Sequence, residues 1–314
     1  MRRVDAIVVG GGPAGLAGAL YLARFRRTLV VLDDGDSRAA RIPRSHNVAG
    51  FPGGIEGTRM IAILREQVEA YGVAIVRARC ERLDAADTGF TAHVEGQAFE
   101  APTVLLATGA LDVEPPMPDI GQALRDGALR YCPVCDGYEA ADTRVGVLCN
   151  STADLHEALY LRHFTPYVQL FVTSAQVVFG DEDRRRLDAA GVTVHPAPVR
   201  SIALVDGRAV VRHDGRETVC DSLYSALGMQ VRSGLAAGLG ARLDRDGYVL
   251  TDAHQQTSIP GLYSAGDVAR GLNQISVAIG GAAVAASAMH LRLLHAAQGE
   301  PPVEPGPFPP ARTN

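Results

Sequence analysis

The chain has 314 residues, 47% of them hydrophobic, so it can bury a large core, and its length suggests two domains. A formal net charge of −5 at pH 7, without a run of Lys or Arg interleaved with aromatic residues, argues against nucleic acid as a partner. The first apolar run, residues 6–9, follows Asp5 and stops at a glycine cluster, which argues against a signal peptide or a membrane span. Five cysteines without a signal peptide indicate a reducing compartment, and we expect a cytoplasmic protein with no membrane partner.

Residues 4–15, VDAIVVGGGPAG, predict a strand, a tight turn and the start of a helix. Gly10, Gly12 and Gly15 have the G-x-G-x-x-G spacing, which lets the chain turn, lets a pyrophosphate approach the backbone and lets helix and strand pack closely. The next predicted strand ends at Asp33, about 20 residues further on, where a carboxylate accepts hydrogen bonds from a ribose. Together these features predict a dinucleotide-binding unit.

Residues 42–54 form a predicted loop that carries His46 and Asn47, and we assign no ligand role to His46. A helix is predicted over 58–71, and Gly72 ends it. Short alternating segments then predict a β-meander, followed by a buried strand and a proline-rich first domain boundary at 114–118. The meander segments are 73–76, 79–83, 90–94 and 98–99, and the buried strand is 103–107.

Residues 131–138, YCPVCDGY, place two cysteines in a C-x-x-C spacing with an acid directly after them. Cys132 and Cys135 can shuttle two electrons as dithiol and disulfide. Asp136 could move the proton if burial raises its pKa. Half of a zinc site is the alternative, but no second C-x-x-C or spaced His pair follows, so we expect a redox pair and no metal.

A shift of 139 positions superposes the first motif on residues 145–172, so the chain contains an internal repeat with a second dinucleotide-type unit. The binding residues are not repeated. The three glycines become Cys149, Ser151 and Asp154, and the ribose acid becomes Val172. A side chain blocks the approach of a pyrophosphate and the Asp154 carboxylate repels it, so we expect a folded unit that has lost nucleotide binding.

The remaining segments complete an α/β fold with two Rossmann-like three-layer domains. We expect a discontinuous cofactor domain, 1–115 and 244–298, with the middle domain, 116–243, inserted into it. Gly261 to Asp267, GLYSAGD, ends a strand at an acid, and a long alanine-rich helix follows Gln274. The proline-rich tail, 299–314, is predicted to be disordered, with docking of Phe308 near a site as the alternative.

The chain resembles low-molecular-weight thioredoxin reductases over roughly residues 4–296, because GGGPAG, LLATGA, CPVCDG, AGD and NQ occur in that family's order. The resemblance implies FAD as cofactor and a homodimer. It also implies that Cys135 faces the flavin and forms the charge-transfer complex or C4a adduct, that Cys132 exchanges with the partner disulfide, and that Asp136 donates the proton. The residues that it implies for FAD binding are Gly10, Gly12, Pro13, Ala14, Gly15, Asp33, Asn47, Thr108, Gly109, Gly266, Asp267, Gln274 and Ile275.

The chain departs from that family in the middle domain, where the intact glycine motif and the basic HRR-type segment for NADPH are both missing. It more closely resembles branches without a nicotinamide site, such as ferredoxin- or flavin-linked disulfide oxidoreductases, or dithiol oxidases that pass electrons to oxygen. The main hypothesis is an FAD-dependent dithiol/disulfide oxidoreductase whose partner is a thioredoxin-like protein or a small dithiol or disulfide. The alternatives are an NADPH-dependent thioredoxin reductase with divergent contacts and a flavin-binding redox sensor that does not turn over.

Overall fold

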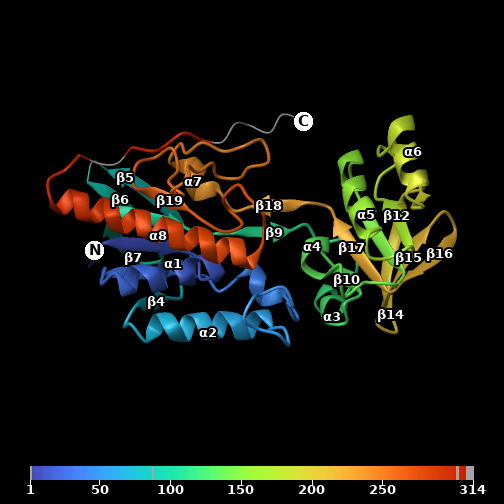
Figure 1. Ribbon diagram of the computed structural model, residues 1–314, viewed down its shortest axis with the longest axis horizontal. Coiled ribbons are helices and arrows are strands. Elements are labelled where there is room, and N and C mark those ends of the chain that lie inside the picture. Colours follow the sequence, from blue (N-terminus) through green and yellow to red (C-terminus); the bar gives the residue numbers. More distant parts are fainter. Residues whose placement is uncertain (1, 87, 302–303, 309–314) are drawn as a thin grey trace.

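The computed structural model describes residues 2–86, 88–301 and 304–308. The chain forms two lobes side by side, joined by an antiparallel pair of strands, β9 (Ala110–Asp112) and β18 (Met229–Val231) (Figure 1). Each lobe contains a five-stranded parallel sheet, so the predicted α/β fold with two Rossmann-like domains is confirmed.

The parallel sheet of the first domain has the strand order β19-β8-β2-β3-β4. Its central strands are fully buried apolar runs because the sheet is covered on both faces, by α1 and α8 on one side and by antiparallel strands on the other. The elements are β2 (Ala6–Val9), α1 (Pro13–Arg24), β3 (Leu29–Leu32), η1 (Arg38–Arg41), α2 (Gly57–Glu69), β4 (Ala74–Val76), β8 (Thr103–Leu106), α7 (Gly234–Gly238), β19 (Leu262–Ser264) and α8 (Ile275–Ala297). Helix α7 falls within the range 116–243 expected for the middle domain, but its Ala236 packs in the core of the first.

The antiparallel layer of the first domain differs from the meander predicted at 73–76, 79–83, 90–94 and 98–99. It contains β5 (Arg82–Ala86), β6 (Gly89–Val94) and β7 (Gln97–Ala101), with β1 (Arg2–Arg3) added parallel to β7. The assignment of 73–76 to this meander is wrong, because β4 pairs parallel with β3 at the edge of the other sheet. A short apolar run after a helix fits either sheet by its side-chain pattern, and the crossover through α2 decides for the parallel one.

The second domain repeats this architecture, with three strands in its antiparallel layer where the first domain has four. Its parallel sheet has the order β10-β17-β11-β12-β13, in which β11 and β12 occupy the places of β2 and β3, and an antiparallel layer of three strands follows. The predicted duplication is therefore visible in the fold. The elements are α3 (Ile120–Arg125), β10 (Leu129–Arg130), α4 (Pro133–Asp136), β11 (Val145–Cys149), η2 (Thr152–Asp154), α5 (Leu155–Leu161), β12 (Val168–Val172), α6 (Asp181–Ala189), β13 (Thr193–His195), β14 (Val199–Val205), β15 (Arg208–His213), β16 (Arg216–Cys220) and β17 (Ser222–Ala226).

Helix α8 is the one helix of the described residues that is long and apolar enough, by length and composition, to cross a membrane. It lies alongside α1 in the first domain (Figure 1). Small residues allow this close packing, and a Cβ on Gly18 of α1 would lie 3.8 Å from the Cβ of Ala282. One face of α8, with Ala282, Ala286 and Met289, belongs to the buried core, so α8 is part of the folded domain.

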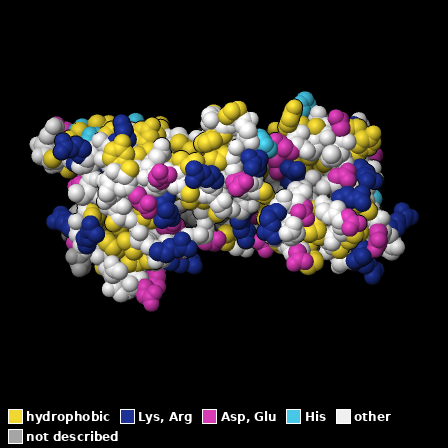
Figure 2. Space-filling view, turned by 90° about the horizontal axis from the view of Figure 1, so that it is seen from below, with side chains coloured by type: hydrophobic (Ala, Val, Ile, Leu, Met, Phe, Trp, Pro, Cys, Tyr) yellow, Lys and Arg dark blue, Asp and Glu magenta, His cyan; other side chains and the backbone are white. Residues whose placement is uncertain are grey.

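The surface carries charges of both signs. In Figure 2, basic and acidic side chains are interspersed over both lobes, and no broad basic area is visible on this face. The described part of the tail contacts the first domain, because the amide of Gly306 donates to Asp252 (2.8 Å) and the Phe308 ring lies against Arg242. Residues 302–303 and 309–314 of the predicted disordered tail lie outside the described residues.

Candidate active site

The glycine loop between β2 and α1 has a conformation that only glycine supports. Gly10 has φ +114°, and a Cβ there would lie 2.2 Å from the carbonyl oxygen of Ala107. A Cβ on Gly15 would lie 1.8 Å from the carbonyl oxygen of Gly10. Gly12 is the N-cap of α1 and no side chain caps it, so the first backbone N–H groups of the helix are available to an anion.

Asp33 lies at the carboxyl end of β3, beside the glycine loop. Its side chain is buried, accepts the amide of Gly35 (2.9 Å) and forms an ion pair with Arg65 of α2. A Cβ on Gly11 would lie 2.2 Å from the Asp33 carboxyl carbon, so the carboxylate sits directly against the loop. This is the arrangement that the sequence predicts for a ribose-binding acid.

A single cavity of about 850 Å³ runs from the glycine loop to the two cysteines. Every residue predicted for FAD binding lines it except Gly15, which lies behind the loop. Gly266 approaches the loop closely, since a Cβ on it would lie 2.8 Å from the Cβ of Ala14. The cavity therefore offers backbone amides at one end, the Asp33 carboxylate beside them and the cysteine pair at the other end, and these residues fit FAD.

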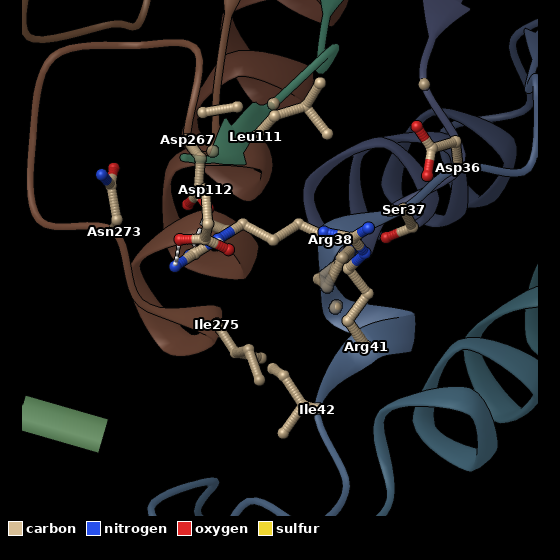
Figure 3. A pocket seen from close by; sticks show the side chains of 18 of the residues that line it. Asp36, Ser37, Arg38, Arg41, Ile42, Leu111, Asp112, Asp267, Asn273 and Ile275 are labelled. Atoms are coloured by element: carbon tan, nitrogen blue, oxygen red, sulfur yellow. Dashed lines mark hydrogen bonds and ion pairs between the residues drawn. The ribbon is translucent and has the colours of Figure 1, made fainter. Parts of the chain in front are cut away.

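Arg38 crosses this cavity and binds two carboxylates (Figure 3). It forms a two-point contact with Asp112, with the shorter distance 2.7 Å, and a third bond of 3.1 Å to Asp267. Burial raises the pKa of Asp267, and the charge of Arg38 opposes this shift. Burial alone would lower the pKa of Arg38, but the hydrogen bonds and charges of the two acids raise it, so the guanidinium stays charged.

Ion pairs fasten the segment around η1 to both strands that connect the domains. Besides Arg38 and Asp112, Arg41 binds Glu114 (2.9 Å) just beyond β9, and Arg232 just beyond β18 pairs with Asp36. The hydroxyl of Thr108 donates to the carbonyl of Arg232 (2.7 Å). These contacts tie the cavity wall to the connection through which the middle domain is held.

Cys132 and Cys135 form a disulfide at the start of α4. The side-chain amide of Gln274 lies 3.4 Å from the sulfur of Cys132 and 3.2 Å from that of Cys135, and Asn47 donates to the Gln274 carbonyl oxygen (2.9 Å). The pair therefore sits at the N-terminus of α8, where Ile275 also lines the cavity. Within the described ranges no group of three or more His, Cys, Asp or Glu could hold a metal ion.

Asp136 directly follows Cys135 in α4, and its side chain is held by two residues that the sequence did not single out. Its carboxylate contacts Arg130 (2.9 Å) and accepts the hydroxyl of the fully buried Tyr224 (2.9 Å). Burial raises the pKa of Asp136, while Arg130 and the hydrogen bond from Tyr224 act against this rise. The net shift of the Asp136 pKa is upward, which is the direction that proton donation requires.

The corresponding loop of the second unit has a different arrangement of backbone donors. The Asp154 carboxylate accepts the amides of Asn150 (3.0 Å) and Ser151 (2.9 Å), and Ser151 completes a capping box with Asp154. Glu157, one turn further, has a carboxylate oxygen that is buried without a partner among the described residues. Burial and the Asp154 charge raise the pKa of Glu157 to about 7.

The comparisons with known proteins agree with this geometry. The sequence model of the pyridine nucleotide-disulphide oxidoreductases matches residues 4–282. The chain belongs to the pyridine nucleotide-disulphide oxidoreductase family. It is 30% identical over 298 residues to a thioredoxin reductase of Treponema pallidum, and the match covers 90% of this chain and 95% of that protein.

Solved structures place this oxidoreductase near the thioredoxin reductases. The crystal structure of thioredoxin reductase from Streptococcus pyogenes aligns with a TM-score of 0.85 at 25% identity, covering 93% of this chain and 98% of the other. The crystal structure of a protein named HlmI aligns with a TM-score of 0.86 at 30% identity, covering 94% of each chain. The protein is thus a thioredoxin-reductase-like flavoprotein oxidoreductase with a Cys132–Cys135 disulfide.

Several site residues of this oxidoreductase carry no signal in the sequence. Arg38 and Arg65 look like ordinary surface arginines, and only the fold brings them to Asp267 and Asp33. His46, to which the sequence gave no role, contacts Glu139 through Nδ1 at 2.9 Å and so joins loop 42–54 to the turn after the disulfide. Tyr224 could have been noticed because it lies on the strand that repeats β8, but that pattern does not indicate a contact with Asp136.

Proposed function

We propose that this oxidoreductase binds FAD in the cavity of the first domain and transfers electrons between the flavin, the Cys132–Cys135 pair and a partner, with a donor or acceptor other than NADPH. The partner is a thioredoxin-like protein or a small dithiol or disulfide. The other redox partner is a ferredoxin, free flavin or oxygen, and a cytoplasmic setting would keep the cysteines available for turnover. The fit of the cavity residues and the family of the chain support FAD.

One observation supports a donor or acceptor other than NADPH: the Asp154 carboxylate already accepts hydrogen bonds from the amides of Asn150 and Ser151. A pyrophosphate needs such amides at this turn, because they and the helix dipole provide its main attraction. Here an incoming phosphate would have to displace a carboxylate that is covalently part of the loop. In the second unit, the Asp154 carboxylate therefore takes the place that a phosphate would need at these amides.

FAD, when bound, supplies the two-electron redox chemistry, and the residues of the chain supply the thiol chemistry. In the direction of disulfide reduction, the Cys132 thiolate attacks one sulfur of the partner disulfide, and the other sulfur leaves as a thiolate that takes a proton from Asp136. Cys135 then attacks Cys132, which re-forms the disulfide and releases the partner's second thiol. Arg130 and Tyr224 hold Asp136 in place during these steps.

A homodimer is also part of the proposal. Val277, Val284 and Leu291 are 46%, 42% and 52% exposed and follow one another at seven-residue intervals along α8. Residues at this spacing lie on one side of a helix, so they form an apolar stripe that a second copy could cover. Sedimentation of the wild-type protein and of Val284→Glu checks this: we expect a dimer that the charge dissociates, and a monomeric wild type would contradict it.

Anaerobic rapid mixing tests the proposed function. A dithiol should bleach the flavin absorbance of the FAD-loaded protein, whereas NADPH should leave the flavin oxidised. Rapid bleaching at micromolar NADPH would instead identify an NADPH-dependent thioredoxin reductase with divergent contacts. If neither reductant acts and no disulfide is turned over, the protein is a redox sensor and not a turnover enzyme.

The Cys135→Ser variant serves as the control for this experiment. We expect it to lose reduction of the flavin by dithiol and turnover of disulfides while it keeps FAD, because the cofactor is held by the first domain. Loss of FAD from Cys135→Ser would contradict the placement of the cofactor in the cavity.

A further inference from the structure

The side chain of Gln274 connects the cofactor cavity with the disulfide. Its Nε2 atom lies within hydrogen-bonding distance of both sulfurs, at 3.4 Å from Cys132 and 3.2 Å from Cys135. An amide nitrogen is only a donor, so it directs N–H groups at the two atoms that change charge during dithiol chemistry.

The orientation of this amide is set by loop 42–54. Asn47 donates through Nδ2 to the Gln274 carbonyl oxygen (2.9 Å), and the Ser45 hydroxyl donates to the Asn47 carbonyl oxygen (2.8 Å). Because the oxygen of Gln274 is turned toward Asn47, its nitrogen faces the sulfurs. Ser45 is itself buried and exchanges two backbone hydrogen bonds with Ile55, so the row of donors begins in an ordered part of the loop.

The neighbouring charged groups are paired with each other. Asp136 is bound by Arg130, and Glu139 is bound by His46. On the side of the first domain, Gln274 is the N-cap of the 23-residue helix α8, whose N-terminus carries partial positive charge. The hydrogen bonds described between the first domain and the two sulfurs therefore come from the uncharged amide of Gln274, at the positive end of a long helix.

We propose that Gln274 is a catalytic residue of the dithiol chemistry, because its amide stabilises the thiolate that exists after the disulfide is reduced, with Asn47 and Ser45 as positioning residues. The inference rests on the proposed exchange of electrons at Cys132 and Cys135. Reduction by a dithiol transfers two electrons and two protons to the pair and oxidises the reductant to its disulfide. One of the two thiols then releases its proton to solvent, and the resulting thiolate accepts the Gln274 N–H bonds.

The experiment measures the thiol pKa in the FAD-loaded protein. The protein is reduced anaerobically with dithiothreitol, freed of reductant and alkylated with iodoacetamide across a pH series, and mass spectrometry follows each cysteine. We expect a lowered pKa for the more reactive thiol of the wild type. In Gln274→Ala the pKa of this thiol should rise by about one unit, because one charge-assisted hydrogen bond to the thiolate is lost. At a pH below the pKa, this rise lowers the fraction of thiolate about tenfold.

Matched variants separate this role from a general structural one. Asn273→Ala is the control, because the Asn273 amide bonds to Tyr248 (3.0 Å) and to the sulfur of Met229, and its described partners do not include either cysteine, so it should leave the thiol pKa unchanged. Gln274→Glu keeps the length of the side chain but presents a carboxylate, so it should raise the pKa more than Gln274→Ala. Asn47→Leu removes the hydrogen bond that orients Gln274 and should raise the thiol pKa less than Gln274→Ala does. Gln274→Asn keeps an amide on a shorter side chain, so its thiol pKa should lie between those of the wild type and Gln274→Ala.

Flavin absorbance of each variant shows whether FAD is retained, and Asn47→Leu carries the test if Gln274→Ala loses it. A wild-type thiol with an ordinary pKa, or equal pKa values in the wild type and all Gln274 and Asn47 variants, would overturn the inference. If dithiothreitol does not reduce the disulfide at all, the proposed function fails instead, and the two failures are therefore distinguishable.

Discussion

The two nucleotide-type units of this chain share a backbone plan but use the start of their helices in opposite ways. In the first unit Gly12 leaves the first amides of α1 without a side-chain cap, beside the acid Asp33. In the second unit Asp154 folds back and binds the amides of Asn150 and Ser151, which correspond to Gly11 and Gly12 of the first loop. The difference shows that a duplicated unit can keep its sheet and helix while a carboxylate of the chain itself binds the amides of its loop.

The largest expected effect comes from making the first unit resemble the second. Gly15→Asp places a side chain where a Cβ would lie 1.8 Å from the carbonyl oxygen of Gly10, so the turn cannot keep its shape. We expect FAD affinity to fall by more than about 100-fold, equivalent to ~2.7 kcal/mol. The flavin-to-protein ratio after purification measures this.

Gly12→Ser keeps this test informative if Gly15→Asp does not fold. A Cβ on Gly12 meets only the Ser37 side chain, at 3.1 Å, so the variant should fold. It should bind FAD more weakly than the wild type but more strongly than Gly15→Asp. A full complement of FAD in Gly15→Asp would show that the loop geometry does not control binding.

A pH-dependent loss of stability should come from Glu157 in the second unit. Its folded-state pKa of about 7 lies above the ordinary value of 4.5, so the folded protein holds this proton more tightly than the unfolded chain does. The stability is full below pH 4.5 and is lost as the pH rises to about 7, by roughly 1–3 kcal/mol. Denaturant unfolding of the wild type and of Glu157→Gln at several pH values measures this difference.

Glu157→Gln removes only the part of the pH dependence that belongs to Glu157, because Asp136 and Asp267 also have raised pKa values. The two stability curves should therefore diverge between pH 4.5 and 7. Parallel curves would show that folding does not raise the pKa of Glu157.

Loss of the capping carboxylate should have a smaller effect. Asp154→Ala leaves the amides of Asn150 and Ser151 unpaired and should lower the free energy of unfolding by about 1 kcal/mol. It should also lower the pKa of Glu157, since the Asp154 charge helps to raise it. Urea unfolding gives the first quantity and its pH dependence the second, and an unchanged midpoint would mean that Asp154 does not bind the loop.

The smallest expected effect concerns the contact between the domains beside the disulfide. His46 and Glu139 have side chains that are 43% and 27% exposed, and solvent screens such pairs. His46→Ala should therefore change stability by less than about 1 kcal/mol and should leave FAD binding intact. Thermal unfolding and flavin content test both expectations, and a loss of FAD would show that this loop supports the cofactor more than the contact indicates.

Much of the fold and part of the site could be predicted from sequence, because glycine spacing, the acid after the second strand and the 139-residue repeat each depend on local chemistry. The strand at 74–76 could not be assigned to its sheet, because its partner is chosen by the crossover and not by its own residues. Arg130 and Tyr224 contact Asp136 only through the pairing of β10 with β17, which no spacing in the sequence indicates. The repulsion of phosphate by Asp154 was predicted, but its binding of two amides depends on side-chain geometry.

The most direct test of this contrast is an amide NMR titration of the FAD-loaded protein with NADPH. If Asp154 holds the amides of Asn150 and Ser151, their signals should not shift at micromolar NADPH. Adding FAD to protein stripped of flavin should, by contrast, move the amide signals of Gly11, Gly12, Ala14 and Gly15. Saturable shifts of Asn150 and Ser151 at micromolar NADPH would contradict the account, because a phosphate would then have replaced the carboxylate.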